Sequence, residues 1–343
     1  MSLAPAELDA TVSSIARAQL PDGAIPWYPG GHVDPWNHVE ATMALDVGGR
    51  HLEAGRAYRW LATAQRSDGA WPASVRRGRV RDATLDANFS AYAAAGAWHH
   101  WLATGDRSFV GWMWPTVERA LDFVLRLQRT DGAIAWARDA GYRPWPRALL
   151  SSSSCIHLSL GCAISLAGLT GNERPDWELS QTNLAHAIGN RRKAFENKDR
   201  FSMDWYYPVL GGVLRREAGA ARIDSRWEHF VEEGLGVRCV ADRPWVTTAE
   251  TCELVLALDA LGLQDRAESL FDWVQHLRAA DGSYWTGATF PDGTRWPVEQ
   301  TTWSSGAVVL AYDALAGSSD TSGFFRSEGD AVPVASQPLA DPF

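Results

Sequence analysis

The sequence predicts an all-α protein folded as a single (α/α)6 toroid, with six inner helices surrounded by six outer helices. Two observations support this prediction. A short motif recurs along the 343-residue chain, and two kinds of helix alternate between its copies. Similarity within one chain at a repeating interval is typical of folds that stack one supersecondary unit on the next.

The recurring motif lies at the end of an amphipathic helix. It consists of Gln or Arg, then two further residues, then Asp-Gly, and then an aromatic residue. Its copies read QLPDGAIPW from Gln19, QRSDGAW from Gln65, QRTDGAIAW from Gln128 and RAADGSYW from Arg278. Two degenerate copies, at 200–207 and 238–246, keep Asp and Trp but lose the Gly. Glycine supplies the positive φ that such a turn needs, and Asp accepts backbone N–H bonds within it. We therefore expect Gln and the aromatic residue (Trp71, Trp136 and Trp285) to join neighbouring helical hairpins.

The two kinds of helix differ in how much of their surface is apolar. Segments such as 86–105, 149–171 and 248–262 are apolar, rich in small residues and typical of buried helices, and most end at glycine. Segments such as 51–65 and 106–128 repeat apolar residues at intervals of three and four, as half-buried helices do. Six alternations favour a closed ring over a linear solenoid. The inner helices are expected to begin near Asp34, Asp86, Ser151, Asp204, Thr248 and Thr301.

The chain is predicted to form one domain, residues 1–317, followed by an extended or disordered tail at 318–343. The tail is rich in Ser, Pro and Asp and has no helical period, and Phe324 and Phe325 are expected to anchor it. The net charge of −9 argues against nucleic acid as a partner. No signal segment or membrane-spanning run is evident, so we expect a cytoplasmic protein that is not transmembrane. The 18 Trp residues favour a small-molecule substrate in an aromatic cavity.

Candidate site residues gather where the inner helices begin. Those starts converge on one mouth of a closed toroid, and their partial positive charge favours carboxylates or anionic ligands. The expected catalytic residues are His38, Glu40, Asp86, Asp204, Glu250 and Glu299. The expected substrate-binding residues are Asp34, Trp36, Asn37, Asn88, Trp205, Tyr206, Trp303, Arg79 and Arg81.

Several of these residues also have a structural interpretation. Asp34 before Pro35 is a favoured helix cap, and Thr247 with Glu250 matches a capping box. The serines at 151–154 suit close helix packing. Arg79 and Arg81 belong to an arginine-rich segment that is either solvated or placed to hold a diphosphate or a sugar acid. The His and Cys residues show no zinc-type spacing, so neither a metal nor another cofactor is expected.

One motif copy, Tyr58-x-Trp60-Leu61-x3-Gln65-x3-Gly69-x-Trp71, resembles the QW motif of terpenoid cyclases. The predicted toroid is similar to the scaffold that these cyclases share with protein prenyltransferase β subunits, over about residues 4–317. The resemblance implies an enzyme, of the cyclase or transferase kind, that acts on an isoprenoid by acid catalysis in a Trp-lined cavity. The chain departs from both families, since it contains neither the D-x-D-D acid motif nor the D-x-C zinc motif.

Two other functions are consistent with the sequence. The α/α architecture also carries many glycoside hydrolases and lyases, and two carboxylates with stacking aromatic residues would serve a carbohydrate-active enzyme. A non-catalytic toroid that binds a ligand is the third. The repeat motif places the isoprenoid interpretation first.

Overall fold

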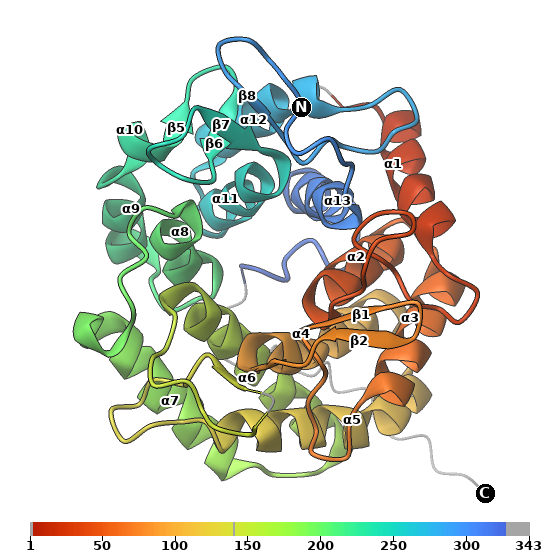
Figure 1. Cartoon of the computed structure of the whole chain (residues 1–343), viewed down its shortest axis with the longest axis vertical. Coiled ribbons are helices and arrows are strands. Elements are labelled where there is room, and N and C mark those ends of the chain that lie inside the picture. Colours follow the sequence, from red (N-terminus) through yellow and green to blue (C-terminus); the bar gives the residue numbers. More distant parts are fainter. Residues whose placement is uncertain (1–2, 140, 327–343) are drawn as a thin grey trace, which may run out of the picture.

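The computed structural model describes residues 3–139 and 141–326, and it confirms the predicted (α/α)6 toroid (Figure 1). Each inner helix of the described chain contacts the next, and the last contacts the first, so the ring is closed. These helices are α2 (Pro35–Val47), α4 (Ala87–Thr104), α6 (Leu150–Thr170), α8 (Ser202–Leu210), α11 (Thr248–Ala260) and α13 (Thr302–Ala316).

The outer layer alternates with the inner one along the chain. Its helices are α1 (Pro5–Ala18), α3 (His51–Ala64), α5 (Arg107–Leu125), α7 (Pro175–Asn190), α9 (Arg216–Asp224) and α12 (Gln264–Trp273). Three shorter helices complete the set: η1 (Arg192–Ala194), α10 (Trp227–Phe230) and η2 (Val274–Leu277).

Short antiparallel strands lie in the connections that enter the inner helices. They are β1 (Ser74–Arg76) with β2 (Arg79–Asp82), β3 (Leu85–Asp86) with β4 (Ala137–Arg138), and the sheet β5 (Val231–Glu232), β6 (Gly236–Arg238), β7 (Trp245–Thr247), β8 (Gly287–Thr289). In β7 and β8, Val246 pairs with Ala288. Because β3 leads directly into α4 and β7 into α11, these strands fix how two inner helices enter the ring.

Small residues allow the inner helices to pack closely. Ala91, Ala94 and Ala95 of α4 are completely buried. A Cβ added to Gly96 of the same helix would lie 2.5 Å from Val39 Cγ1 of α2. The segments rich in small residues therefore form the inner layer. Bulkier side chains at these positions would force neighbouring helices of the ring apart.

The recurring motif joins adjacent outer helices. Gln65 Nε2 donates to Gly69 O of its own turn and to Thr116 O of α5, both at 2.9 Å. Gly69 has a φ of +95°, and a Cβ there would lie 2.0 Å from Arg119 O. The expected joining role of Gln is confirmed, and Gln19 and Gln128 bond in the same way to α3 and α7.

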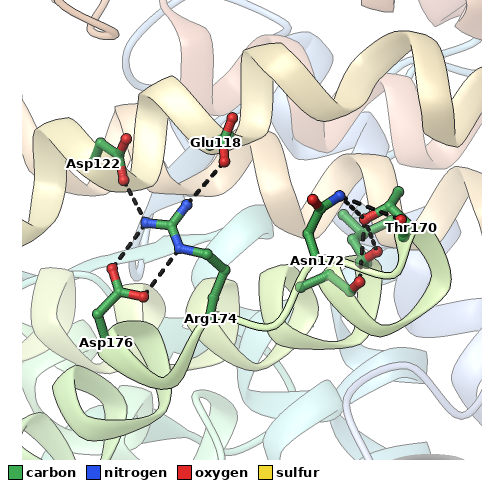
Figure 2. A network of polar contacts seen from close by, with 8 residues as sticks. Glu118, Asp122, Thr170, Asn172, Arg174 and Asp176 are labelled. Carbon is green, nitrogen blue, oxygen red and sulfur yellow. Dashed lines mark hydrogen bonds and ion pairs between the residues drawn. The ribbon is translucent and has the colours of Figure 1, made fainter.

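A second joint involves Arg174, at the start of α7 (Figure 2). Its guanidinium lies 3.2 Å from Glu118 and 2.6 Å from Asp122 of α5, and 2.8 Å from Asp176 of α7. The same group lies over the Trp177 ring, 4.0 Å from its centroid. One cation thus ties two outer helices together through three carboxylates and an aromatic face.

The segment after α13 crosses the centre of the ring in the view of Figure 1. Phe324 and Phe325 are buried, and the Phe324 ring packs against His99 of α4. Arg326 Nε lies 2.6 Å from Asp259 Oδ2, near the end of α11. Residues 318–326 therefore cover the end of the toroid where inner helices finish, and the rest of the predicted tail lies outside the described residues.

Helix α6 is long and apolar enough to cross a membrane, judged by length and composition alone. In the toroid it packs against α4, α5, α7 and α8, with more than half of its apolar stretch buried. Its apolar character is therefore explained by its place in the inner ring.

Candidate active site

The starts of the inner helices form one mouth of the toroid, and side chains cap several of them. Asp34 Oδ1 accepts a hydrogen bond from the Asn37 N–H at 2.9 Å, and Asp86 Oδ1 accepts one from the Phe89 N–H at 3.1 Å. Thr301 caps α13 in the same way. The two carboxylates lie where the partial positive charge of α2 and α4 is greatest.

A cavity of about 300 Å³ opens at this mouth. Half of its lining residues are aromatic, and polar groups come from the first turns of α2, α4 and α6. The lining residues are Trp27, Trp36, Asn37, Asp86, Asn88, Phe89, Trp136, Ser151, Ser152, Met203, Tyr207 and Trp303. Of the predicted site residues, Trp36, Asn37, Asp86, Asn88 and Trp303 are therefore brought together here.

Three buried polar atoms on this wall make no hydrogen bond within the described chain. They are Asn37 Oδ1, Asn88 Oδ1 and Trp303 Nε1. The Asn37 amide nitrogen is held by Asp34 Oδ2 at 2.6 Å, which fixes the orientation of the side chain. Because a buried polar group without a partner is costly, two acceptors and one donor here are ready for a polar ligand.

Asp86 is the carboxylate that directly lines the cavity. Burial raises its pKa to about 7, against the opposing effect of hydrogen bonds from the Phe89 backbone and the Trp136 side chain. The negative charge of Asp34 raises it further. Burial also raises the pKa of Asp34. A carboxyl that titrates near neutral pH can donate a proton under physiological conditions.

Glu250 lies on the first turn of α11, which is opposite α4 in the order of the ring. The predicted capping box is not formed, because the side chain of Thr247 makes no capping bond. Glu250 is almost completely buried and lies one turn before Glu253. Its carboxylate is therefore not used as a cap, and the Cys239 side chain is a hydrogen-bond partner for it.

A smaller pocket lies deeper in the ring and shares Trp36 and Tyr207 with the cavity. Glu40 and Glu253 line it, each bonded to tyrosine. Tyr92 donates to Glu40, and burial raises the pKa of Glu40 to about 7. Burial and the charge of Glu250 raise the pKa of Glu253 well above its usual range. The structure thus places Glu40 beneath the cavity.

Four predicted site residues do not line the cavity and are engaged by other groups. Both ring nitrogens of His38 bond backbone groups, Ile25 N at 3.0 Å and Ala57 O at 3.0 Å, and burial lowers its pKa to about 4. Trp205 stacks on Phe230 and donates to Arg222 O. The other two are Asp204, whose Oδ2 lies 3.3 Å from Arg192, and Tyr206, which donates to Glu253. We do not retain these four as residues that contact a ligand.

The other predicted residues lie at the edge of the site. Glu299 Oε1 accepts a hydrogen bond from Trp27 Nε1 at 3.1 Å, so it positions a ring of the cavity wall. Arg79 and Arg81 lie on β2, where every residue is exposed, and neither belongs to the lining of the cavity. The expected anion-binding cluster is therefore a solvated hairpin in this structure.

Sequence reasoning missed Trp27 and Trp136 as cavity residues, and the joining role expected of Trp136 is wrong. The residue two positions after the motif glycine is the one buried in the joint, as Ile25, Trp71 and Ile134 show. Trp27 and Trp136 come four positions after their glycines and therefore reach the mouth. The number of residues between the motif glycine and the Trp could therefore have distinguished, in the sequence, a Trp in the joint from a Trp in the cavity wall.

Within residues 3–139 and 141–326 there is no group of three or more His, Cys, Asp or Glu residues that could hold a metal ion. The absence of a metal or cofactor from the reaction stays a prediction.

The fold is similar to those of solved enzymes that act on sugars. A solved glycosidase in complex with glucose matches with a TM-score of 0.71 at 16% identity, over 92% of this chain and 99% of that one. A D-mannose isomerase matches with a TM-score of 0.66 at 12% identity, over 89% and 96%. At such low identities these likenesses establish the fold alone.

The family is shown by a closer relative. The chain is 53% identical to an MMP endo-(1,4)-3-O-methyl-alpha-D-mannosidase from Mycolicibacterium hassiacum, over 94% of this chain and 90% of that protein. The chain therefore belongs to the family of this mannosidase. No protein-family model matches the sequence.

The predicted kinship with terpenoid cyclases and prenyltransferases is wrong, as is the isoprenoid substrate that it implied. The motif behind it specifies the joint between outer helices, through Gln65 and Gly69, rather than any group in the cavity. Any α/α toroid must make such joints, so the motif indicates the scaffold and not the chemistry. The carbohydrate-active alternative is the one supported.

Proposed function

We propose that this protein is an endo-acting glycoside hydrolase that cleaves α-(1,4)-linked chains of 3-O-methyl-mannose. The observation that carries the proposal is the cavity at the mouth, where Asp86 lies among aromatic rings and unpartnered amide oxygens. The activity named for the relative at 53% identity supports the choice of sugar.

The cavity wall suits a methylated sugar. Methylation of a hydroxyl removes a hydrogen-bond donor and adds apolar surface, which favours contact with flat aromatic rings. Trp36 and Trp303 meet edge to face, with ring centroids 5.7 Å apart, and form one such wall. Asn37 Oδ1 and Asn88 Oδ1 accept hydrogen bonds from the remaining hydroxyls.

The carboxylates supply an acid and a base. The protonated carboxyl of Asp86, buried beside Asp34, donates its proton to the glycosidic oxygen as the bond from that oxygen to the anomeric carbon breaks. Glu250 accepts a proton from a water molecule whose oxygen forms the new bond to the anomeric carbon. The two residues belong to helices on opposite sides of the ring, and we expect them to act on opposite faces of the sugar with inversion of configuration, as a pair of acid and base does in inverting enzymes.

Incubation of the protein with α-(1,4)-linked 3-O-methyl-mannose oligosaccharides tests this proposal. We expect mass spectrometry to show internal cleavage into shorter oligosaccharides, and proton NMR to show inversion at the new reducing end. Glu250→Gln should abolish cleavage, whereas the exposed substitution Glu173→Gln is the control. The proposal is wrong if the wild-type protein leaves these chains intact, or if Asp86→Asn and Glu250→Gln both cleave at the wild-type rate.

A further inference from the structure

A second, larger cavity lies outside the mouth, on the side where α8 and α11 begin. It has a volume of about 460 Å³ and is lined by Arg200, Phe201, Val240, Arg243, Pro244, Trp245, Thr289 and Trp296. None of these residues lines the cavity that holds Asp86. It is therefore a separate pocket that the catalytic site does not use.

The pocket is built around a fixed pair of tryptophans. Trp245 and Trp296 meet edge to face, with ring centroids 4.8 Å apart. Trp245 Nε1 donates to the Trp296 carbonyl at 2.7 Å, so the two indoles are held in one arrangement. Trp296 nevertheless remains 55% exposed. An exposed aromatic surface that is held in one arrangement inside a pocket is suited to stack on the face of a sugar ring.

Polar groups stand beside these rings. Arg200 lies over the face of Phe201, 5.6 Å from its centroid, and its Nη2 is 2.8 Å from Asp242 Oδ1. The carboxylate offsets the charge of this arginine, so the guanidinium offers hydrogen bonds more than net charge. Arg243 also lines the pocket and shares the charge of Asp242, so the pocket offers several hydrogen-bond donors beside flat rings, an arrangement that suits the hydroxyl and ether oxygens of a sugar.

The pocket is continuous in sequence with the catalytic mouth. Phe201 directly precedes α8, and Met203, two residues later, lines the catalytic cavity. Trp245 begins β7, which leads into α11 and hence to Glu250. An endo-acting enzyme binds a chain that extends beyond the sugars at the cleaved bond. The pocket lies on the Glu250 side, where such a chain would leave the cavity.

We propose that this pocket is a distal sugar-binding site that holds a further residue of the same methylated chain, with Trp296 as the surface on which the sugar stacks. The proposal rests on the proposed function, since it takes its ligand from the substrate of that reaction. According to this proposal, the Trp296 side chain favours long chains as substrates without contacting the bond that is cleaved.

The test compares a short and a long 3-O-methyl-mannose oligosaccharide, one just long enough to be cleaved and one several sugars longer. Trp296→Ala should lower the ratio of kcat/KM for the long chain to that for the short chain by about tenfold, from the loss of one stacked sugar. Trp112→Ala is the matched control, because Trp112 is 47% exposed and lies on the outer helix α5.

The outcomes separate the two proposals. If the wild-type protein cleaves both chains and Trp296→Ala keeps the wild-type ratio, the distal site is wrong and the proposed function stands. If the wild-type protein cleaves neither chain, the proposed function fails. Phe201→Ala, read by the same ratio, guards against a local rearrangement of the loop in Trp296→Ala: a ratio lowered in both variants supports the distal site, and a ratio lowered in Trp296→Ala but not in Phe201→Ala overturns it.

Discussion

Replacing Asp86 by Asn should remove activity and, at the same time, stabilise the protein above neutral pH. Asn caps a helix as well as Asp does, so the bond from the Phe89 N–H at 3.1 Å can be kept. The amide cannot donate a proton as an acid, and loss of a general acid typically lowers the rate by about 10²- to 10⁴-fold. The stability effect follows from the buried carboxyl.

The sign of the stability effect comes from the raised pKa. Burial raises the pKa of Asp86 to about 7 in the folded protein, from a reference value of 3.8. The folded state therefore holds this proton more tightly than the unfolded state does. The contribution of the proton to the free energy of unfolding is complete below about pH 4 and is lost as the pH rises to 7. The slope is about 1.4 kcal/mol per pH unit, so about 2.5 kcal/mol is lost between pH 5 and pH 7.

Chemical denaturation of the wild-type protein and Asp86→Asn at pH 5, 6, 7 and 8 measures this contribution. The free energy of unfolding of the variant should fall by about 2.5 kcal/mol less than that of the wild type between pH 5 and pH 7. Glu40, whose pKa burial also raises to about 7, contributes equally to both proteins and cancels in the difference. Parallel pH dependences in the two proteins would refute the assignment of a neutral-pH proton to Asp86.

Three further outcomes are expected. Glu250→Gln should abolish hydrolysis, with a melting temperature within a few degrees of wild type because Glu250 makes no capping bond, and an early-melting, active variant would contradict its role as base. Asn88→Ala should raise KM about tenfold, because Asn88 Oδ1 has no partner in the described chain, whereas an unchanged KM would show that no sugar contacts it. Gly69→Ala should destabilise the fold by about 3 kcal/mol, since its Cβ would meet Arg119 O at 2.0 Å, while Gly111→Ala, where the space is open, should not; calorimetry on both variants checks this.

The sequence predicted most of the scaffold because local signals mark its joints. Asp34 before Pro35 and Asp86 before α4 are helix caps that can be recognised in the sequence, and the structure uses both. The motif glycines likewise mark the positions of their turns in the sequence. The start of α8 has no such signal, because its capping residue is Phe201 and no side chain bonds the first turn.

That missing signal explains the largest difference between the expected and the observed lining of the cavity. We expected the fourth inner helix to begin near Asp204, which pointed Trp205 and Tyr206 into the cavity. The helix begins at Ser202, so the face that reaches the cavity carries Met203 and Tyr207, one helical turn apart. A shift of two residues at the start of a helix turns its side chains by more than half a revolution.

The kind of substrate could not be predicted from the motif copies. Their Gln side chains donate hydrogen bonds to backbone carbonyls of the next outer helix, and their Gly residues pack against its backbone. Such contacts are the same whatever the cavity holds. The groups that suit a sugar, Asn37 Oδ1 and Asn88 Oδ1, become recognisable only when burial shows them without partners.

The segment 318–326 determines the path that a polymer can take. Phe325 lines the deep pocket beneath the catalytic cavity, and Arg326 bonds Asp259 at the far end of α11. The toroid is therefore a cup rather than a tube. Under the proposed function, a polysaccharide therefore binds across the rim, is cut there and releases both fragments from the side on which it arrived, rather than threading through the ring.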